Sequence, residues 1–303
     1  MTHVDLQSYP KISIVTPCYN HVRFIDETMR SIHSQGYPRL EHIVIDGGST
    51  DGSLDVLLRY ADRLAWWCSE RDSGHGEALA KGIQRATGEI LTWVCSDDLL
   101  LPGALFSVAR YFQQHPQEDW VVGDGLKIDG NSRILRLIYG MPLTHSGLVH
   151  WTFGGTVQPS IFVRTEAFER AGRRGKFLDL APDFDLALRL ARRRPSGYLR
   201  SFLGALRIHS ETQTIRKNDQ LQRVVATLRQ RELQYSGCHR LSWVRGRRAL
   251  VRYAATRMWR LSTEVVAPSP YCVGEQLGAL IPMGTPACEQ QGGRADVHCA
   301  ENA

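Results

Sequence analysis

The first part of the chain alternates between short apolar runs rich in β-branched residues and longer segments with helical periodicity. The apolar runs are residues 11–16, 42–46, 64–68 and 89–95, and helix-like segments follow at 23–34, 53–60, 77–86 and 102–113. This alternation predicts βαβ units and therefore a mostly parallel sheet covered by helices on both faces. Ligands bind such sheets at the carboxyl ends of the strands. We therefore expect functional residues in the segments 17–20, 46–51, 69–74 and 96–98.

Beyond Trp120 the alternation stops. Strand-like runs around Leu126 and Ile134 flank the turn Asp129-Gly130-Asn131, which predicts a hairpin. Further elements are expected as a strand at 160–164, a helix at 166–171, an amphipathic helix from Asp183, a last strand at 198–207 and two helical segments after residue 217. After Pro268 the composition turns to Gly, Pro and polar residues, which predicts a poorly ordered tail.

The composition is that of a globular protein. Hydrophobic residues make up 43% and charged residues 22% of the chain, which excludes a collagen-like, coiled-coil or mostly disordered protein. The seven cysteines form no CxxC pair, so neither a zinc site nor a disulfide framework is expected. The sequence shows no signal-peptide pattern and no apolar run of membrane-spanning length. These features predict a cytoplasmic protein.

The formal net charge of +6 comes from one stretch. Residues 189–260 contain 18 Lys and Arg against three acids, a local charge of +15, whereas the residues before them carry −5 and those after them −4. A strongly basic segment predicts a polyanionic partner. That prediction applies to this stretch alone.

Acidic residues follow two of the predicted strands. Asp46 ends a run that should be buried, where a carboxylate is costly without a partner, so a ligand hydroxyl or ring N–H is the favoured partner. Asp97 and Asp98 are adjacent at a strand end and repel each other unless a cation lies between them. Hard divalent ions prefer carboxylate oxygen, so Mg²⁺ or Mn²⁺ is expected. The alternative is a solvated loop that caps the next helix. Asp46 and Asp72 are expected at neighbouring strand ends, and their presence favours the metal site.

Five segments taken together resemble the family 2 inverting glycosyltransferases of the GT-A fold. They are TPCYN (16–20), HIVIDGGSTDGS (42–53), SERDSGHGEALAKGIQRATGEILTWVCSDDLLLPGAL (69–105), VQPSIFVR (157–164) and APDFDLALRLA (181–191), in the family's order over about residues 11–212. The resemblance implies an α/β, Rossmann-like fold with a mixed, mostly parallel central sheet and, here, a helical C-terminal extension. The expected domains are a catalytic domain at 1–215 (nucleotide-sugar half about 11–120, acceptor half about 121–215), a basic amphipathic helical extension at 216–266 and a tail at 267–303.

The resemblance also implies roles for individual residues. The nucleotide-sugar contacts would be Thr16, Pro17, Tyr19, Asp46, Asp72, Lys81 and Asp97. Asp97 and Asp98 match the DxD-type region that holds the metal, and His209 resembles a late element that can approach it, with a packed histidine as the alternative. Asp183 matches the general base. Trp151 and Gln158 lie where the family shapes the acceptor pocket, although burial in the core explains them equally well.

Two positions depart from the family's pattern. The family often has Asp or Asn at the position of Cys95, and Asn at the position of Ala80. Neither change removes the acidic pair, but both alter residues near the expected sugar site.

The implied reaction moves a sugar from a nucleotide-diphospho-sugar, with UDP favoured, to a hydroxyl of a saccharide or lipid-linked saccharide in the assembly of surface polysaccharide or glycolipid. A divalent cation would neutralise the leaving diphosphate, and Asp183 would accept the proton of the attacking hydroxyl. The alternative is a non-catalytic nucleotide-binding scaffold docked on a membrane. The presence of Asp97, Asp98 and Asp183 favours the enzyme.

Residues 243–261 place apolar side chains on one helical face and Arg245, Arg248, Arg252, Arg257 and Arg260 mainly on the other. This pattern predicts a basic amphipathic helix on an anionic membrane surface, with the protein peripheral on the inner face of the plasma membrane. A surface helix packed on the catalytic domain explains the pattern equally well. No nucleic-acid motif accompanies the charge, so nucleic acid is not expected as a partner.

Overall fold

The structure is a computed structural model, which describes residues 8–150, 156–172 and 179–236. The predicted segment 243–261, the tail from residue 267 and Trp151 lie outside the described residues. Within the described chain, no helix has both the length and the apolar character needed to cross a bilayer.

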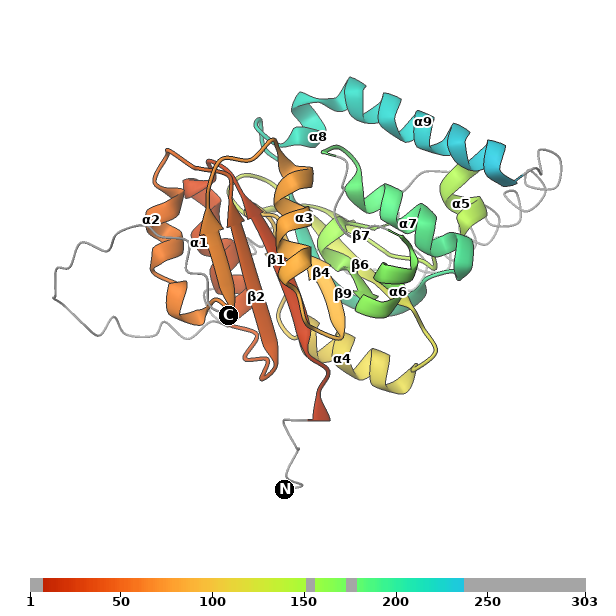
Figure 1. The fold of residues 1–303 in the computed structure, drawn as a ribbon, viewed down its shortest axis with the longest axis horizontal. Coiled ribbons are helices and arrows are strands. Elements are labelled where there is room, and N and C mark those ends of the chain that lie inside the picture. Colours follow the sequence, from red (N-terminus) through yellow and green to blue (C-terminus); the bar gives the residue numbers. More distant parts are fainter. Residues whose placement is uncertain (1–7, 151–155, 173–178, 237–303) are drawn as a thin grey trace, which may run out of the picture.

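A nine-stranded sheet forms the centre of the fold (Figure 1). The strands are β1 (Ile12–Cys18), β2 (Leu40–Asp46), β3 (Trp66–Ser69), β4 (Ile90–Trp93), β5 (Leu99–Leu100), β6 (Trp120–Ile128), β7 (Ile134–Ile138), β8 (Ile161–Arg164) and β9 (Gly197–Arg207). Their order is β3-β2-β1-β4-β8-β6-β9-β5, and β7 pairs with β6. The parallel half (β3, β2, β1, β4) confirms the predicted βαβ units. β8 pairs antiparallel with β4 and β6, which makes the whole sheet mixed.

Helices cover both faces of the sheet, as predicted. They are α1 (Val22–His33), α2 (Ser53–Leu58), α3 (His75–Arg85), α4 (Ala104–Gln114), α5 (His145–His150), α6 (Thr165–Arg170), α7 (Pro182–Arg193), α8 (Gln213–Arg216) and α9 (Asn218–Ser236), with 3-10 turns η2 (Ala61–Arg63) and η3 (Gln158–Ser160). One face packs against α3, α5, α6, α7 and α9. The other packs against α1, α2 and α4.

The alternation of side chains along the strands explains this double coverage. Ile12 and Ile14 of β1 join the core beneath α4, whereas Val15 joins the core beneath α3. Gly82 lets α3 approach β1 closely, because a Cβ atom there would lie 2.4 Å from Val15 Cγ1. The close fit of this helix on the sheet fixes the position of its first turn at the sheet edge.

The helix α9 crosses the second half of the molecule (Figure 1). It is held by Glu232, whose side chain is fully buried. The Glu232 carboxylate accepts hydrogen bonds from Arg192 of α7 at 2.5 and 2.6 Å and lies 3.0 Å from His145 Nε2 of α5. These contacts outweigh burial and lower the pKa of Glu232 to about 2. The first part of the predicted C-terminal extension is therefore joined to α5 and α7.

Candidate active site

The parallel strands bring the predicted polar segments to one edge of the sheet. Cys18 pairs with Asp46, and Asp46 pairs with Ser69, so these three strands end side by side. Asp46 is fully buried. Its carboxylate accepts hydrogen bonds from Ser49 N at 3.0 Å, Ser49 Oγ at 2.5 Å and Ser69 Oγ at 2.6 Å. Asp46 therefore has partners within the chain, and burial alone does not require a ligand.

The predicted nucleoside contacts at the end of β1 differ in how exposed they are. The Thr16 hydroxyl is buried and lies 2.9 Å from His42 Nε2 in the neighbouring strand, so it points into the layer below α1. Pro17 is also buried. Tyr19, in the loop after β1, is 60% exposed. Of the three predicted nucleoside contacts, Tyr19 presents its side chain most openly to solvent.

Asp72 and Lys81 lie near the third strand end. Asp72 Oδ1 accepts a hydrogen bond from Gly74 N at 3.0 Å, and a Cβ atom on Gly47 would lie 3.0 Å from Asp72 Oδ2. Burial raises the pKa of Asp72. Lys81 forms ion pairs with Glu70 at 3.0 Å and Glu77 at 2.9 Å. The Lys81 ammonium is therefore already held by two carboxylates beside the site.

The acidic pair follows β4 and is fixed by β9. The short strand β5, directly after Asp98, pairs antiparallel with β9. Arg207, only 1% exposed, donates its backbone N–H to Asp98 Oδ1 at 2.9 Å and its Nε to the Asp97 carbonyl at 2.7 Å. Its guanidinium also pairs with Glu27 at 2.7 Å. Arg207, at the end of β9, thus holds both aspartates in place.

Two groups of potential metal ligands share Asp97. His209 Nε2 lies 3.0 Å from Asp97 Oδ2. Donor atoms of His21, Asp97 and His209 all lie within 4.8 Å of one another, and so do those of Cys95, Asp97 and Asp98. Imidazole, thiolate and carboxylate groups are common ligands of divalent transition metals. Either group fits a divalent cation, and the predicted metal residue Asp97 belongs to both, with His209 in one and Asp98 in the other.

The electrostatics differ between the two aspartates. Burial raises the pKa of Asp97, but the hydrogen bond from His209 and the nearby imidazoles outweigh it, so this pKa lies below its usual value. Burial and the adjacent Asp97 raise the pKa of Asp98 well above its usual value. A cation would relieve the repulsion between the two carboxylates.

Asp183 lies in the first turn of α7, after Ala181 with φ 57° and Pro182. The proline fits this position because its missing N–H would have no partner in the helix. Burial raises the pKa of Asp183, and its charge contributes to the raised pKa values of Cys95 and Asp98, so Asp183 lies within electrostatic range of the acidic pair. The neighbouring Asp185 is buried and pairs instead with Arg189 at 3.1 Å and Arg231 at 2.9 Å. Asp185 is thus a structural residue.

The predicted acceptor residue Gln158 starts η3. Its Nε2 donates to the Trp93 carbonyl at 2.6 Å, and its Oε1 is buried without a hydrogen-bond partner among the described residues. Gln158 therefore lies at the end of β4, the strand that the acidic pair follows.

Three nearby residues were not predicted for the site. His21 joins the metal donors, and its Nδ1 lies 2.7 Å from Ser96 Oγ. His75, in the first turn of α3, has a pKa lowered to about 4 by burial, although Asp97 and Asp179 oppose that shift. Asp179 accepts a hydrogen bond from Gly76 N at 2.8 Å. The position of His21 directly after TPCYN could have identified it from the sequence. His75 and Asp179 could not have been found in this way, because only the tertiary structure brings them together.

Comparison with known proteins identifies the fold and the family. The model of the family "Glycosyl transferase family 2" matches residues 13–174. The chain belongs to glycosyl transferase family 2. Among solved structures of this kind, S. aureus TarS gives a TM-score of 0.55 at 20% identity, covering 72% of this chain and 39% of TarS. The mannosyltransferase PcManGT from Pyrobaculum calidifontis, in complex with GDP-Man and Mn²⁺, gives 0.50 at 18% identity and covers 84% of both chains. These likenesses confirm the GT-A fold.

The sequence relatives of this family 2 chain are named as glycosyltransferases. An uncharacterized glycosyltransferase of Rickettsia felis is 27% identical over 218 residues, which is 67% of this chain and 35% of the relative. One from Rickettsia typhi is 30% identical, covering 60% of this chain and 59% of the relative. The putative teichuronic acid biosynthesis glycosyltransferase TuaG of Bacillus subtilis is 36% identical over 92 residues, 29% of this chain and 36% of TuaG. The chain spans from about a third to three fifths of these relatives' lengths.

Proposed function

We propose that this family 2 chain is an inverting, metal-dependent glycosyltransferase that moves a sugar from a nucleotide-diphospho-sugar to an acceptor hydroxyl. The observation that carries the proposal is the meeting of Asp97, Asp98 and His209 with Asp183 at one edge of the sheet. A carboxylate that can take the proton of the acceptor hydroxyl thus lies near side chains that can bind a divalent cation. Both are needed to displace a diphosphate.

Asp183 would act as the base. Burial raises its pKa, so its carboxylate takes up a proton more readily than an exposed aspartate does. The acceptor hydroxyl would give its proton to Asp183 while its oxygen forms a bond to the anomeric carbon. The bond between that carbon and the diphosphate oxygen breaks with its electron pair, and the configuration inverts. The phosphate leaving group needs no second catalytic carboxylate.

The cation would be held by Asp97 with His209, His21, Asp98 and Cys95 as the available partners. When bound, Mn²⁺ or Mg²⁺ supplies positive charge that neutralises the diphosphate as it leaves. Arg207 keeps Asp97 and Asp98 in place, and Ser96 orients the His21 ring. Oriented ligands bind metal more tightly because less freedom is lost on binding.

Our proposals for the sugar donor and for the pathway are based on similarity to other proteins. Structures of TarS contain UDP and UDP-GlcNAc, and PcManGT contains GDP-Man. We favour a UDP-sugar, with Tyr19, Asp46, Asp72 and Lys81 around the nucleotide and sugar and Trp151 and Gln158 towards the acceptor. The likeness to TuaG supports a saccharide or lipid-linked acceptor in cell-surface polysaccharide assembly. In this proposal the basic segment 243–261 brings the chain to the inner face of the membrane.

A two-step experiment tests the proposal. Protein freed of metal on a chelating resin is melted with UDP or GDP, each with and without Mn²⁺, and we expect one nucleotide with metal to raise the melting temperature. Release of that nucleoside diphosphate from its sugars is then measured with a membrane extract as acceptor source. The absence of stabilisation by either nucleotide with Mn²⁺ contradicts nucleotide-sugar binding. Stabilisation without release supports the scaffold instead of the enzyme.

A further inference from the structure

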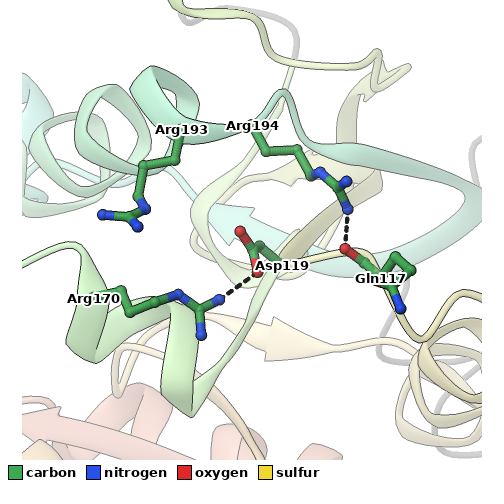
Figure 2. Close-up of a pocket in the computed structure, with 5 residues that line it drawn as sticks. All are labelled: Gln117, Asp119, Arg170, Arg193 and Arg194. Atoms are coloured by element: carbon green, nitrogen blue, oxygen red, sulfur yellow. Dashed lines mark hydrogen bonds and ion pairs between the residues drawn. The ribbon is translucent and has the colours of Figure 1, made fainter.

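A second charged site lies away from the acidic edge of the sheet. It is an open pocket of about 460 Å³ lined by Gln117, Asp119, Arg170, Arg193 and Arg194 (Figure 2). Gln117 and Asp119 precede β6, Arg170 ends α6, and Arg193 and Arg194 end α7. Three arginines thus line one small concave surface with a single carboxylate.

The pocket is remote from the candidate active site. Asp183 lies in the first turn of α7 and Arg193 is its last residue, and a helix of that length spans about 18 Å. The sheet gives the same result. Ile90, at the start of β4, pairs with Arg164, and Val163 pairs with Trp120, so Asp119 lies near the start of β4. Asp97 follows the other end of that strand.

The positive charge of the pocket is only partly neutralised. Arg170 pairs with Asp119 at 2.6 Å and with the exposed Glu166 at 3.6 Å. Arg194 donates a hydrogen bond to the Gln117 carbonyl, which carries no charge to balance it. The Arg193 side chain has no hydrogen-bond or ion-pair partner among the described residues, and Figure 2 shows no dashed line from it. Within the described part of the chain, the guanidinium groups of Arg193 and Arg194 therefore have no carboxylate partner.

The end of a helix favours basic residues, because its last carbonyls carry partial negative charge. That effect accounts for each arginine by itself, because Arg193 and Arg194 lie at the end of α7 and Arg170 lies in the last turn of α6. It does not explain why the two helix ends meet at one pocket. Their convergence gives an anion cationic partners from two separate elements.

We propose that this pocket binds a phosphate group, carried by a soluble phosphorylated compound or by a lipid headgroup. Guanidinium groups present paired N–H donors that match two phosphate oxygens. The polar lining disfavours an apolar ligand, and the volume accommodates a phosphate with part of the group that carries it. The acidic edge near Asp97 and Asp98 repels such an anion when no metal is present, so the two sites can be measured separately.

The first test titrates inorganic phosphate into the full chain at low salt, after metal removal on a chelating resin, and follows binding by calorimetry. We expect a dissociation constant of about 0.1–1 mM, as for a few exposed charge-assisted contacts. The double variant Arg193→Gln/Arg194→Gln should weaken binding by about tenfold or more. A matched control, Arg110→Gln/Arg136→Gln, removes two exposed arginines from α4 and β7 and should bind phosphate like the parent chain.

The second test identifies the source of the phosphate by pelleting the same proteins with vesicles of phosphatidylglycerol or phosphatidylcholine. Pelleting with phosphatidylglycerol that falls in the Arg193/Arg194 variant, but not in the control, supports a lipid headgroup. Phosphate binding without a difference between the variants in pelleting supports a soluble compound. The proposal is overturned when phosphate does not bind, or binds both double variants equally. Neither result depends on glycosyl transfer, and circular dichroism checks that the variants remain folded.

Discussion

His209 Nε2 lies 3.0 Å from Asp97 Oδ2, although the two residues are 112 positions apart in the chain. His21 joins them within 4.8 Å. We expect His209→Gln and His21→Gln each to weaken Mn²⁺ binding by about tenfold or more, since each removes a nitrogen ligand. Electron paramagnetic resonance of free Mn²⁺ measures the affinity without requiring activity. His115→Gln, at an exposed position after α4, is the control; unchanged affinity in both site variants contradicts the assigned ligands.

Asp183→Asn should abolish release of the nucleoside diphosphate while nucleotide binding with metal remains, because the amide cannot accept the proton of the acceptor. Asp185→Asn is the matched comparison. It weakens buried ion pairs with Arg189 and Arg231, so we expect it to lower the melting temperature more than the Asp183 variant does. Loss of nucleotide binding in Asp183→Asn would remove the assignment of this residue as the base.

Glu232→Gln should lower the free energy of unfolding by roughly 2–3 kcal/mol, because it leaves Arg192 and Arg231 near a buried group that no longer carries charge. The value is below that of a fully buried pair, since the side chains of these arginines are 30% and 42% exposed. Urea denaturation measures the change. Glu166→Gln, at a side chain that is 86% exposed, should change stability by less than about 0.5 kcal/mol. Equal effects would show that Glu232 does not hold α9.

Acidic pH should destabilise the fold through His33. Burial lowers the pKa of His33 to about 4, and that of His42, 3.0 Å away, also falls well below its usual value. The unfolded chain takes up these protons near pH 6.5, whereas the folded chain does not. Stability therefore falls as the pH drops from about 6.5 towards 4, by at most about 1.4 kcal/mol per pH unit for each proton.

Thermal melting between about pH 7 and pH 5 measures this dependence. His33→Gln should flatten the curve, whereas His115→Gln should leave its shape unchanged. A curve in His33→Gln as steep as in the parent chain would exclude His33 as a source.

Periodicity and strand-end position predicted much of the fold and several residues that the structure brings to the candidate site. The strands β1, β2 and β4, and the aspartates at the ends of β2 and β4, follow from local pattern, and the family resemblance added Asp183 and His209. Arg207 was not assigned a role because its contacts with Asp98 and Glu27 arise from pairing between β5 and β9. A two-residue strand has no periodicity to detect.

The role of Glu232 was hidden for a similar reason. It is one of three acids in a stretch with a charge of +15, and local charge gives no sign that one carboxylate is buried. The partners of Asp46 were also missed, because Ser49 and Ser69 are ordinary loop and strand-end residues until the strands are placed side by side.

The pairing of β5 with β9 also determines when the centre is completed during synthesis. The ribosome delivers the strands β1 to β4 first. A nascent or truncated chain that ends before β9 contains both aspartates, yet lacks Arg207 to fix them and His209 to approach them. Only a chain that extends through β9 can therefore hold the two aspartates as they are held in the folded protein.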